Sequence, residues 1–157
     1  MLAVQRPCPN PHTDESCCSE RGSGQILVAV DTDVIVRLLT QDDARQSSRA
    51  RAIFERETKI FIAESVLLET EWVLRFAYGF KKQQVVDAFR KLLGLKSIRV
   101  NDGWVVRAAI DWHEQGLDFA DALHLATGRD ATTLLTFDRP FVKAASKLAG
   151  NVTVKEA

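Results

Sequence analysis

Four acidic residues stand where a chain of alternating strands and helices can bring them to one place: Asp31, Glu69, Asp121 and Asp138. Asp31 and Asp138 each follow a short apolar or β-branched run, and Asp121 lies at the start of a helical one. Carboxylates that converge repel one another by roughly 4 kcal/mol per pair at ~4 Å and an effective dielectric constant of about 20. A divalent cation that prefers oxygen ligands is the usual compensation. The four acids therefore predict a metal centre.

Glu69 is expected to point into the protein. Val73 and Phe76 lie four and seven residues after it, which places all three on one face of a helix. Glu71 has Arg75 four residues later, the favourable order for a solvated ion pair, whereas Glu69 has no such local partner. Because an unpaired acid on an apolar face is costly, this pattern indicates a ligand role for Glu69.

The Asp residues also suit the N-caps of helices, where the side chain accepts hydrogen bonds from first-turn amides. Asp118 and Asp121, three residues apart, resemble a partial capping box. Capping is the favoured interpretation for Asp118, and both interpretations stay open for Asp31, Asp121 and Asp138. Thr136 lies two residues before Asp138 and could hydrogen-bond a carboxylate or a metal-bound water from behind the ligands.

The residues between the acids predict alternating strands and helices. Runs typical of strands cover residues 26–30, 59–63, 97–100, 132–137 and 151–154. Helical spacing of apolar residues covers 31–40, 42–57, 65–78, 82–93, 102–115, 118–129 and 140–148, with Ser65 as a candidate N-cap. This order predicts an α/β fold with a parallel sheet covered by helices on both faces. Ligands of such sheets bind at the carboxyl ends of the strands, where Asp31 and Asp138 are expected.

Composition limits the class of protein. The length of 157 residues suggests one domain, and 46% of the residues are hydrophobic. The 21 basic residues are balanced by 21 acidic ones, so the chain lacks the net positive charge of a non-specific DNA-binding protein. Residues 1–24, rich in Pro, Ser, Cys and Gly, are expected to be a disordered N-terminal extension to a domain over 25–157. Cys8, Cys17 and Cys18 all fall there, which favours a reducing, cytoplasmic setting. No apolar run approaches the ~18 residues of a membrane span.

Two other residue types receive structural interpretations. His113 and His124 have no companions at metal-ligand spacing and are expected to be surface residues or satisfied core residues. The tryptophans at positions 72, 104 and 112 stand at helical spacing and are expected in the core.

The chain resembles PIN-domain ribonucleases, in particular VapC-type toxins of toxin–antitoxin pairs. The resemblance rests on four segments in order: VDTDVI at 30–35, SVLLETEWVLR at 65–75, GLDFADALHLA at 116–126 and LTFDR at 135–139. It implies a PIN-like three-layer sandwich with a central parallel sheet of about five strands. It also implies a Mg²⁺ or Mn²⁺ site built from Asp31, Glu69, Asp121 and Asp138.

The same resemblance implies metal-dependent hydrolysis of RNA phosphodiester bonds, inhibition by a cognate antitoxin and, commonly in this family, a homodimer. Arg37, Arg75 and Arg139 are candidates for contacts with RNA phosphates, with surface ion pairing as the alternative. The chain departs from the family in two places. Asp33 stands where Asn is frequent, and Pro140 stands where a further acid often follows, which argues against a complete second metal site.

Two other functions stay open. Asp31 and Asp33 after an apolar strand are also similar to the first motif of haloacid-dehalogenase-type phosphatases, with Asp31 as nucleophile and Asp33 as general acid. The chain is short for that fold and ends soon after Asp138. A PIN-like binding module without catalysis is the third possibility, and the four intact acids argue against it.

Overall fold

The computed structural model describes residues 27–148 and 152–157. The predicted extension over residues 1–24, with its three cysteines, therefore lies outside the described residues. No helix in the described ranges is long and apolar enough to cross a membrane.

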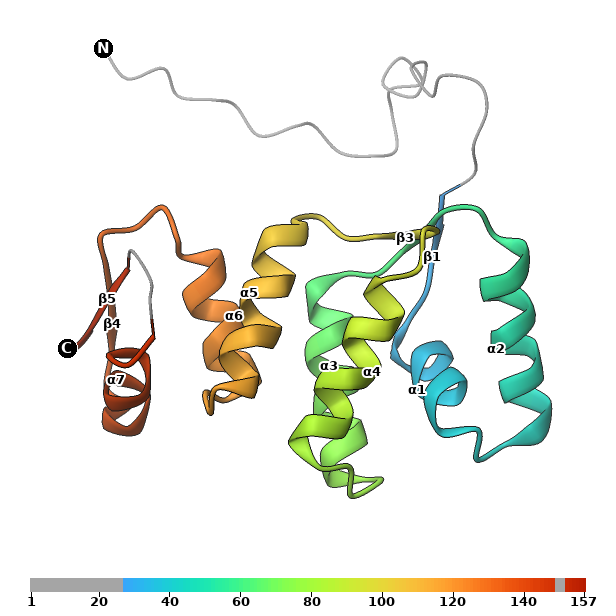
Figure 1. The fold of residues 1–157 in the computed structure, drawn as a ribbon, viewed down its shortest axis with the longest axis horizontal. Coiled ribbons are helices and arrows are strands. Elements are labelled where there is room, and N and C mark those ends of the chain that lie inside the picture. Colours follow the sequence, from blue (N-terminus) through green and yellow to red (C-terminus); the bar gives the residue numbers. More distant parts are fainter. Residues whose placement is uncertain (1–26, 149–151) are drawn as a thin grey trace, which may run out of the picture.

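Strands and helices alternate along the described chain, as the sequence predicts (Figure 1). The first sheet region comprises β1 (Val28–Ala29), α1 (Thr32–Thr40), α2 (Ala44–Arg56), β2 (Ile60–Phe61), α3 (Glu64–Phe76), α4 (Lys82–Leu93) and β3 (Ile98–Arg99). The remaining elements are α5 (Gly103–Glu114), α6 (Phe119–Thr127), β4 (Thr133–Thr136), α7 (Arg139–Ala145) and β5 (Thr153–Glu156). The bounds of α4 are those predicted. Strands β1 to β4 are shorter than expected, and β5 has the expected length but begins two residues later than predicted.

Aspartates start most of the helices. The N-cap side chains of Asp31, Asp43, Asp102, Asp118 and Asp138 each accept a hydrogen bond from a first-turn amide, at the starts of α1, α2, α5, α6 and α7. This arrangement satisfies amides that have no partner within the helix. The prediction of Ser65 as the N-cap is wrong: the N-cap of α3 is Ala63, two residues earlier, and Ser65 lies within the first turn of the helix.

Within the described residues all strand pairs are parallel, which confirms the α/β class, but hydrogen bonds divide the five strands found there into two sheets. The first has the order β1-β2-β3, and the second pairs β4 with β5. We call β4, α7 and β5 the C-terminal unit. Along the longest axis of the molecule, α3 to α6 lie between the first sheet and this unit (Figure 1). The expected central sheet of about five strands is thus present as two separate sheets, one of three strands and one of two.

The core forms where β2, α3, α4, α5 and α6 meet. Ile60 and Ile62 of the β2 segment are fully buried, and the rings of Phe89 and Phe119 pack with centroids 5.5 Å apart. Of the three tryptophans expected in the core, only Trp112 is buried. Trp72 and Trp104 are 58% and 46% exposed, so that expectation is wrong for both. The reason for Trp72 lies in the orientation of α3, described next.

Candidate active site

The first two acids lie where α1 meets α3. Asp31 follows β1 and caps α1, with an Oδ1 atom 3.1 Å from the amide nitrogen of Val34. The buried hydroxyl of Thr32 donates a 2.6 Å hydrogen bond to Oε2 of Glu69. Thr32 thereby holds the Glu69 carboxylate beside the start of α1. The residue pattern alone did not predict this role of Thr32, although its position directly after Asp31 could have indicated it.

Glu69 faces solvent, contrary to the expected orientation of α3. The helix buries Leu67, Thr70, Glu71 and Leu74 and exposes Glu69 together with Trp72 and Phe76. Both faces carry apolar residues at helical spacing, so periodicity alone could not choose between them. Packing of α3 against α1, α4 and α6 decides in favour of the face with Leu67 and Leu74. An exposed carboxylate beside Asp31 is compatible with a ligand role.

Glu71, expected to be solvated, is instead the buried acid of α3. It is 4% exposed, and its Oε1 atom lies 3.2 Å from a guanidinium nitrogen of Arg75 and 3.4 Å from Nε2 of His113. Nδ1 of His113 donates to the carbonyl oxygen of Leu117 at 2.8 Å. Burial is the main cause that raises the pKa of Glu71 and lowers that of His113. This contact ties α3 to the turn that leads into α6.

Mild acid should destabilise the protein through His113. Its pKa in the folded chain lies below the ordinary 6.5, so below that pH the unfolded chain binds more protons than the folded one. The free energy of unfolding should therefore fall as the pH drops from 7 towards about 5.5. Urea unfolding of the wild-type chain and of His113→Gln at several pH values measures the effect. Equal pH slopes in the two proteins would contradict it.

The other acids gather around the start of α6. Asp121 lies in the first turn of this helix, which Asp118 caps through the amide of Ala120. The pKa of Asp121 is raised, first by burial and then by the negative charges of Asp118 and Asp138. The capping interpretation of Asp118 is confirmed. Asp121 lies within the electrostatic reach of two further carboxylates, which is the uncompensated charge that the sequence analysis anticipated.

Asp138 caps α7 and is oriented by the residue two positions before it. Its Oδ1 atom accepts a 2.9 Å hydrogen bond from the amide of Phe141. Its own amide donates to Oγ1 of Thr136 at 3.0 Å. Capping occupies one oxygen, whereas a carboxylate has two oxygens and about four lone-pair sites. Asp31 and Asp138 can therefore cap their helices and still offer an oxygen to another ligand.

The two groups of acids do not merge in this structure. Within residues 27–148 and 152–157, no three His, Cys, Asp or Glu side chains lie close enough together to hold a metal ion. Asp31 stands at the end of β1 and Asp138 at the end of β4, on separate sheets. The donors are of the kind that Mg²⁺ prefers, but this arrangement does not fit the ion. A centre that uses all four predicted ligands requires the two groups to approach each other.

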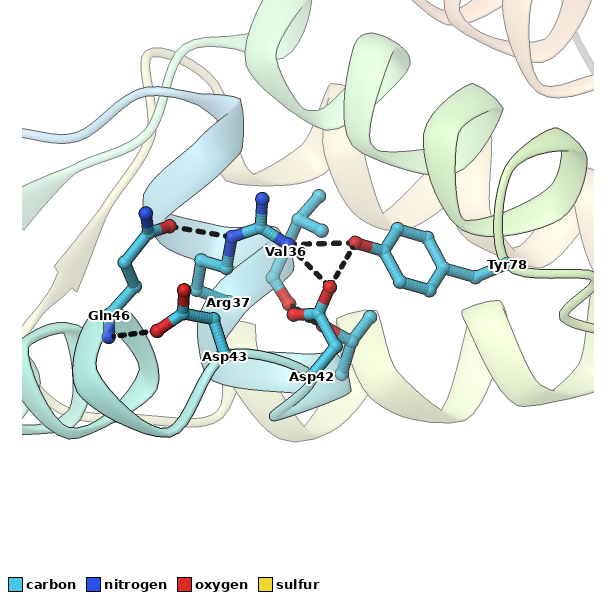
Figure 2. A network of polar contacts seen from close by, with 7 residues as sticks. Val36, Arg37, Asp42, Asp43, Gln46 and Tyr78 are labelled. Carbon is cyan, nitrogen blue, oxygen red and sulfur yellow. Dashed lines mark hydrogen bonds and ion pairs between the residues drawn. The ribbon is translucent and has the colours of Figure 1, made fainter.

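The arginines considered for phosphate contacts are all engaged in ion pairs. Figure 2 shows Arg37 between Asp42, Gln46 and Tyr78, at distances of 2.6, 2.8 and 2.8 Å. Hydrogen bonds from Tyr78 and Arg37 lower the pKa of Asp42. Arg75 pairs with Glu71, and Arg139 pairs with Glu156 at 2.8 Å. The alternative of surface pairing is thus the one observed, and Arg37 joins α1 to α2 and to the end of α3.

A cavity elsewhere does not coincide with the acids. It has a volume of about 560 Å³ and lies between α4, β3 and α5, where Arg90, Arg99 and Arg107 surround apolar side chains that include Ile98. None of the four predicted ligands lines it. The candidate site is therefore defined by its carboxylates and not by this concavity.

Comparison with known proteins identifies the fold. The family model of the PIN domain matches residues 28–147, a range that contains all four predicted ligands. The chain belongs to the PIN domain family. The fold predicted from the sequence is thereby confirmed, and the phosphatase alternative is not supported.

Two solved structures are similar to this PIN domain. One is Mycobacterium tuberculosis VapC20, described as a Sarcin-Ricin loop cleaving toxin, which is 25% identical; the match covers 74% of this chain and 94% of that chain, with a TM-score of 0.39. The other is VapBC2 from Rickettsia felis bound to a DNA fragment from their promoter, which is 14% identical; the match covers 83% and 98%, with a TM-score of 0.35. Comparison with curated proteins gave no significant match.

Proposed function

We propose that this PIN domain is a metal-dependent endoribonuclease and the toxin of a toxin–antitoxin pair. The observation that supports the proposal best is the set of acids at the four family segments: Asp31, Glu69, Asp121 and Asp138. Asp31, Glu69 and Asp138 are exposed, and Asp121 is crowded by like charges, so the set has spare coordinating capacity. We take residues 25–157 as the catalytic domain and the cytoplasm, where RNA is abundant, as its place of action.

Mg²⁺ or Mn²⁺ is the proposed cofactor, because both take carboxylate oxygens, and its binding would require the two groups of acids to approach each other. The chain contributes the ligands and the groups that orient them. Thr32 holds Glu69 by its hydroxyl, and Thr136 holds the backbone of Asp138. Asp118 supports Asp121 by fixing the start of α6.

The proposed inhibitor is an antitoxin that covers the exposed acids. A segment with a positive charge fits this surface, because Asp31 and Glu69 on one side and Asp118 and Asp138 on the other present negative charge to solvent. The three candidate arginines form ion pairs with acids outside the predicted ligand set: Arg37 with Asp42, Arg75 with Glu71 and Arg139 with Glu156. They therefore leave the negative charge of the four predicted ligands for a positively charged segment of the antitoxin.

RNA cleavage should require a divalent metal ion. We expect the purified chain to cleave a mixed RNA pool in Mg²⁺ or Mn²⁺ and to lose cleavage in EDTA, since carboxylates repel the phosphate anions of RNA unless a cation lies between them. Gel analysis of the RNA measures this. Undiminished cleavage in EDTA would overturn the metal dependence, and no cleavage under any condition would overturn the nuclease proposal.

Metal binding has a second readout that does not need activity. An ion that binds the folded chain and not the unfolded chain stabilises it by about 2.7 kcal/mol at ~100 times its dissociation constant. This shift in the thermal melt should vanish in the double variant Asp31→Asn, Asp121→Asn. A shift that persists in the double variant places the metal at other residues.

A further inference from the structure

The cavity between α4, β3 and α5 takes no part in the acidic site. Its volume is about 560 Å³, and cavities of about 300–1,000 Å³ are typical of sites for small molecules. Its floor is apolar and shielded from water, because Ile98, Val106 and Ile110 are only 8%, 1% and 2% exposed. A ligand of the size of one nucleotide therefore has both room and an apolar surface to contact.

Two of the three arginines that line this cavity have no acidic partner among residues 27–148 and 152–157: Arg99 and Arg107. One guanidinium nitrogen of Arg99 donates to the carbonyl oxygens of Lys96 and Ile98, at 2.8 and 2.7 Å. These bonds hold the group in place and leave its other nitrogens for a ligand. A Cβ atom at Gly103 would lie 3.8 Å from Nη2 of Arg107, so this guanidinium turns back over the start of α5.

The third arginine is already neutralised. Arg90 forms ion pairs of 2.8 Å with Asp111 and 2.7 Å with Glu114. Asp111 is the acid that lines the cavity, and its charge is therefore matched by Arg90. The positive charges of Arg99 and Arg107 are left over, so the lining attracts an anion.

The edge of β3 beside the cavity is poorly suited to pair with another strand. The amide of Ile98 donates to the carbonyl oxygen of Leu95 at 3.1 Å, and its carbonyl oxygen accepts from Arg99 at 2.7 Å. An added peptide strand would have to break both contacts to pair with this residue. A compact anion fits the cavity better than an extended peptide.

We propose that this cavity binds one nucleotide, with its phosphate held by Arg99 and Arg107 and its base on the apolar floor. The planar fork of arginine matches phosphate oxygens and can donate two hydrogen bonds to them. A base offers a flat face that the buried side chains of the floor can cover. The nucleotide is either free or one unit of a single-stranded RNA, and the two sources share this chemistry.

The register of the first sheet relates the cavity to the acids. Ala29, Phe61 and Arg99 are paired across its three parallel strands, so Arg99 lies two strand spacings, or ~10 Å, from Ala29. Asp31 follows Ala29 by two residues. A few nucleotides of single-stranded RNA can bridge such a separation, so a unit held in the cavity would position the chain relative to Asp31. This positioning of RNA rests on the proposed nuclease function, whereas the binding of a nucleotide does not.

Calorimetric titration in EDTA tests the site without any cleavage. Adenosine 5′-monophosphate should bind at least about 10-fold more tightly than adenosine or inorganic phosphate, since each of these lacks one half of the ligand. Arg99→Gln and Arg107→Gln should each weaken binding by about 10-fold, because a hydrogen bond to a charged group is lost. Arg51→Gln is the matched control, an exposed arginine of α2 outside the cavity, and should bind like the wild type.

Three results would overturn the site. They are no binding of adenosine 5′-monophosphate to the wild-type chain, binding that both cavity substitutions leave unchanged, and binding of inorganic phosphate as tight as that of the nucleotide. Each result stands even if the chain cleaves RNA. Conversely, a chain that cleaves no RNA but binds the nucleotide through Arg99 and Arg107 keeps the site and loses only the nuclease proposal.

A 2′-O-methyl RNA trinucleotide, titrated in the same way, distinguishes the two sources of the nucleotide. If RNA is the source, the trinucleotide should bind at least about 10-fold more tightly than the mononucleotide and should lose affinity in the same two variants. If the source is a free nucleotide, the mononucleotide should bind at least as tightly as the trinucleotide. Tight binding of the trinucleotide that is insensitive to both substitutions would place the RNA elsewhere and contradict the site.

Discussion

The variant Asp31→Asn should cleave RNA at least about 100-fold more slowly than the wild-type chain and should keep its stability. Loss of a residue that merely orients a metal ligand costs 10–100-fold in typical sites, so loss of a ligand should cost at least the upper end. Asn caps helices as well as Asp does, so α1 should retain its start at the Val34 amide. Cleavage rates at saturating Mn²⁺ and thermal melts without metal measure the two effects.

Asp43→Asn is the matched control for this variant. Asp43 caps α2 by the same kind of contact, with its Oδ1 atom 2.8 Å from the amide of Gln46, and it belongs to neither group of predicted ligands. Its replacement should leave cleavage unchanged. If both Asn variants cleave RNA at the wild-type rate, Asp31 serves only as a cap and the proposed ligand set is incorrect.

Glu71→Leu should lower the free energy of unfolding by about 2–3 kcal/mol, because it removes the buried carboxylate that accepts a charge-assisted hydrogen bond from Arg75. For a chain of this size, such a loss lowers the melting temperature by roughly 5–10 °C. Glu69→Gln should stay within about 0.5 kcal/mol of the wild type, since Glu69 is exposed. Urea unfolding of both variants measures the contrast, which depends on the observed orientation of α3.

A paired substitution tests the reason for the loss. Replacing both polar partners by apolar groups is far less costly than removing one, so Glu71→Leu combined with Arg75→Leu should be more stable than Glu71→Leu alone. The contrast between the two glutamates reverses if Glu69→Gln unfolds more easily than Glu71→Leu. That result would restore the orientation of α3 expected from the sequence.

The order and type of the elements followed from the sequence because their signals are local. Apolar runs of four to six residues predicted the strands, and Asp residues before helical spacing predicted the starts of α1, α6 and α7. Gly94, directly after Leu93, marked the end of α4. The four segments that carry the resemblance to PIN domains are likewise local patterns of residue type and spacing, and the family match over residues 28–147 confirms the family that they predicted.

The burial of individual side chains was decided by tertiary structure. α3 has two apolar stripes, and packing against its neighbours buried the one with Glu71 and exposed the one with Glu69, Trp72 and Phe76. The hydroxyl of Thr32 found Glu69 across 37 residues of chain, a contact that no local pattern encodes. The ion pairs of Arg37 and Arg139 likewise depend on elements that meet only in the folded chain.

The arrangement of the acids shows the same division between local and distant effects. The sequence by itself determined which residues are candidate ligands and that Asp31 and Asp138 end parallel strands. It could not determine which strands become neighbours, because strand order depends on hydrogen bonds between segments about 100 residues apart. The tertiary structure placed β1 and β4 on different sheets. It also anchored the segment that connects α6 to β4 through the ion pair of Arg129 with Asp102. The identity of the acids is therefore a property of the sequence, and their distance from one another is a property of strand pairing.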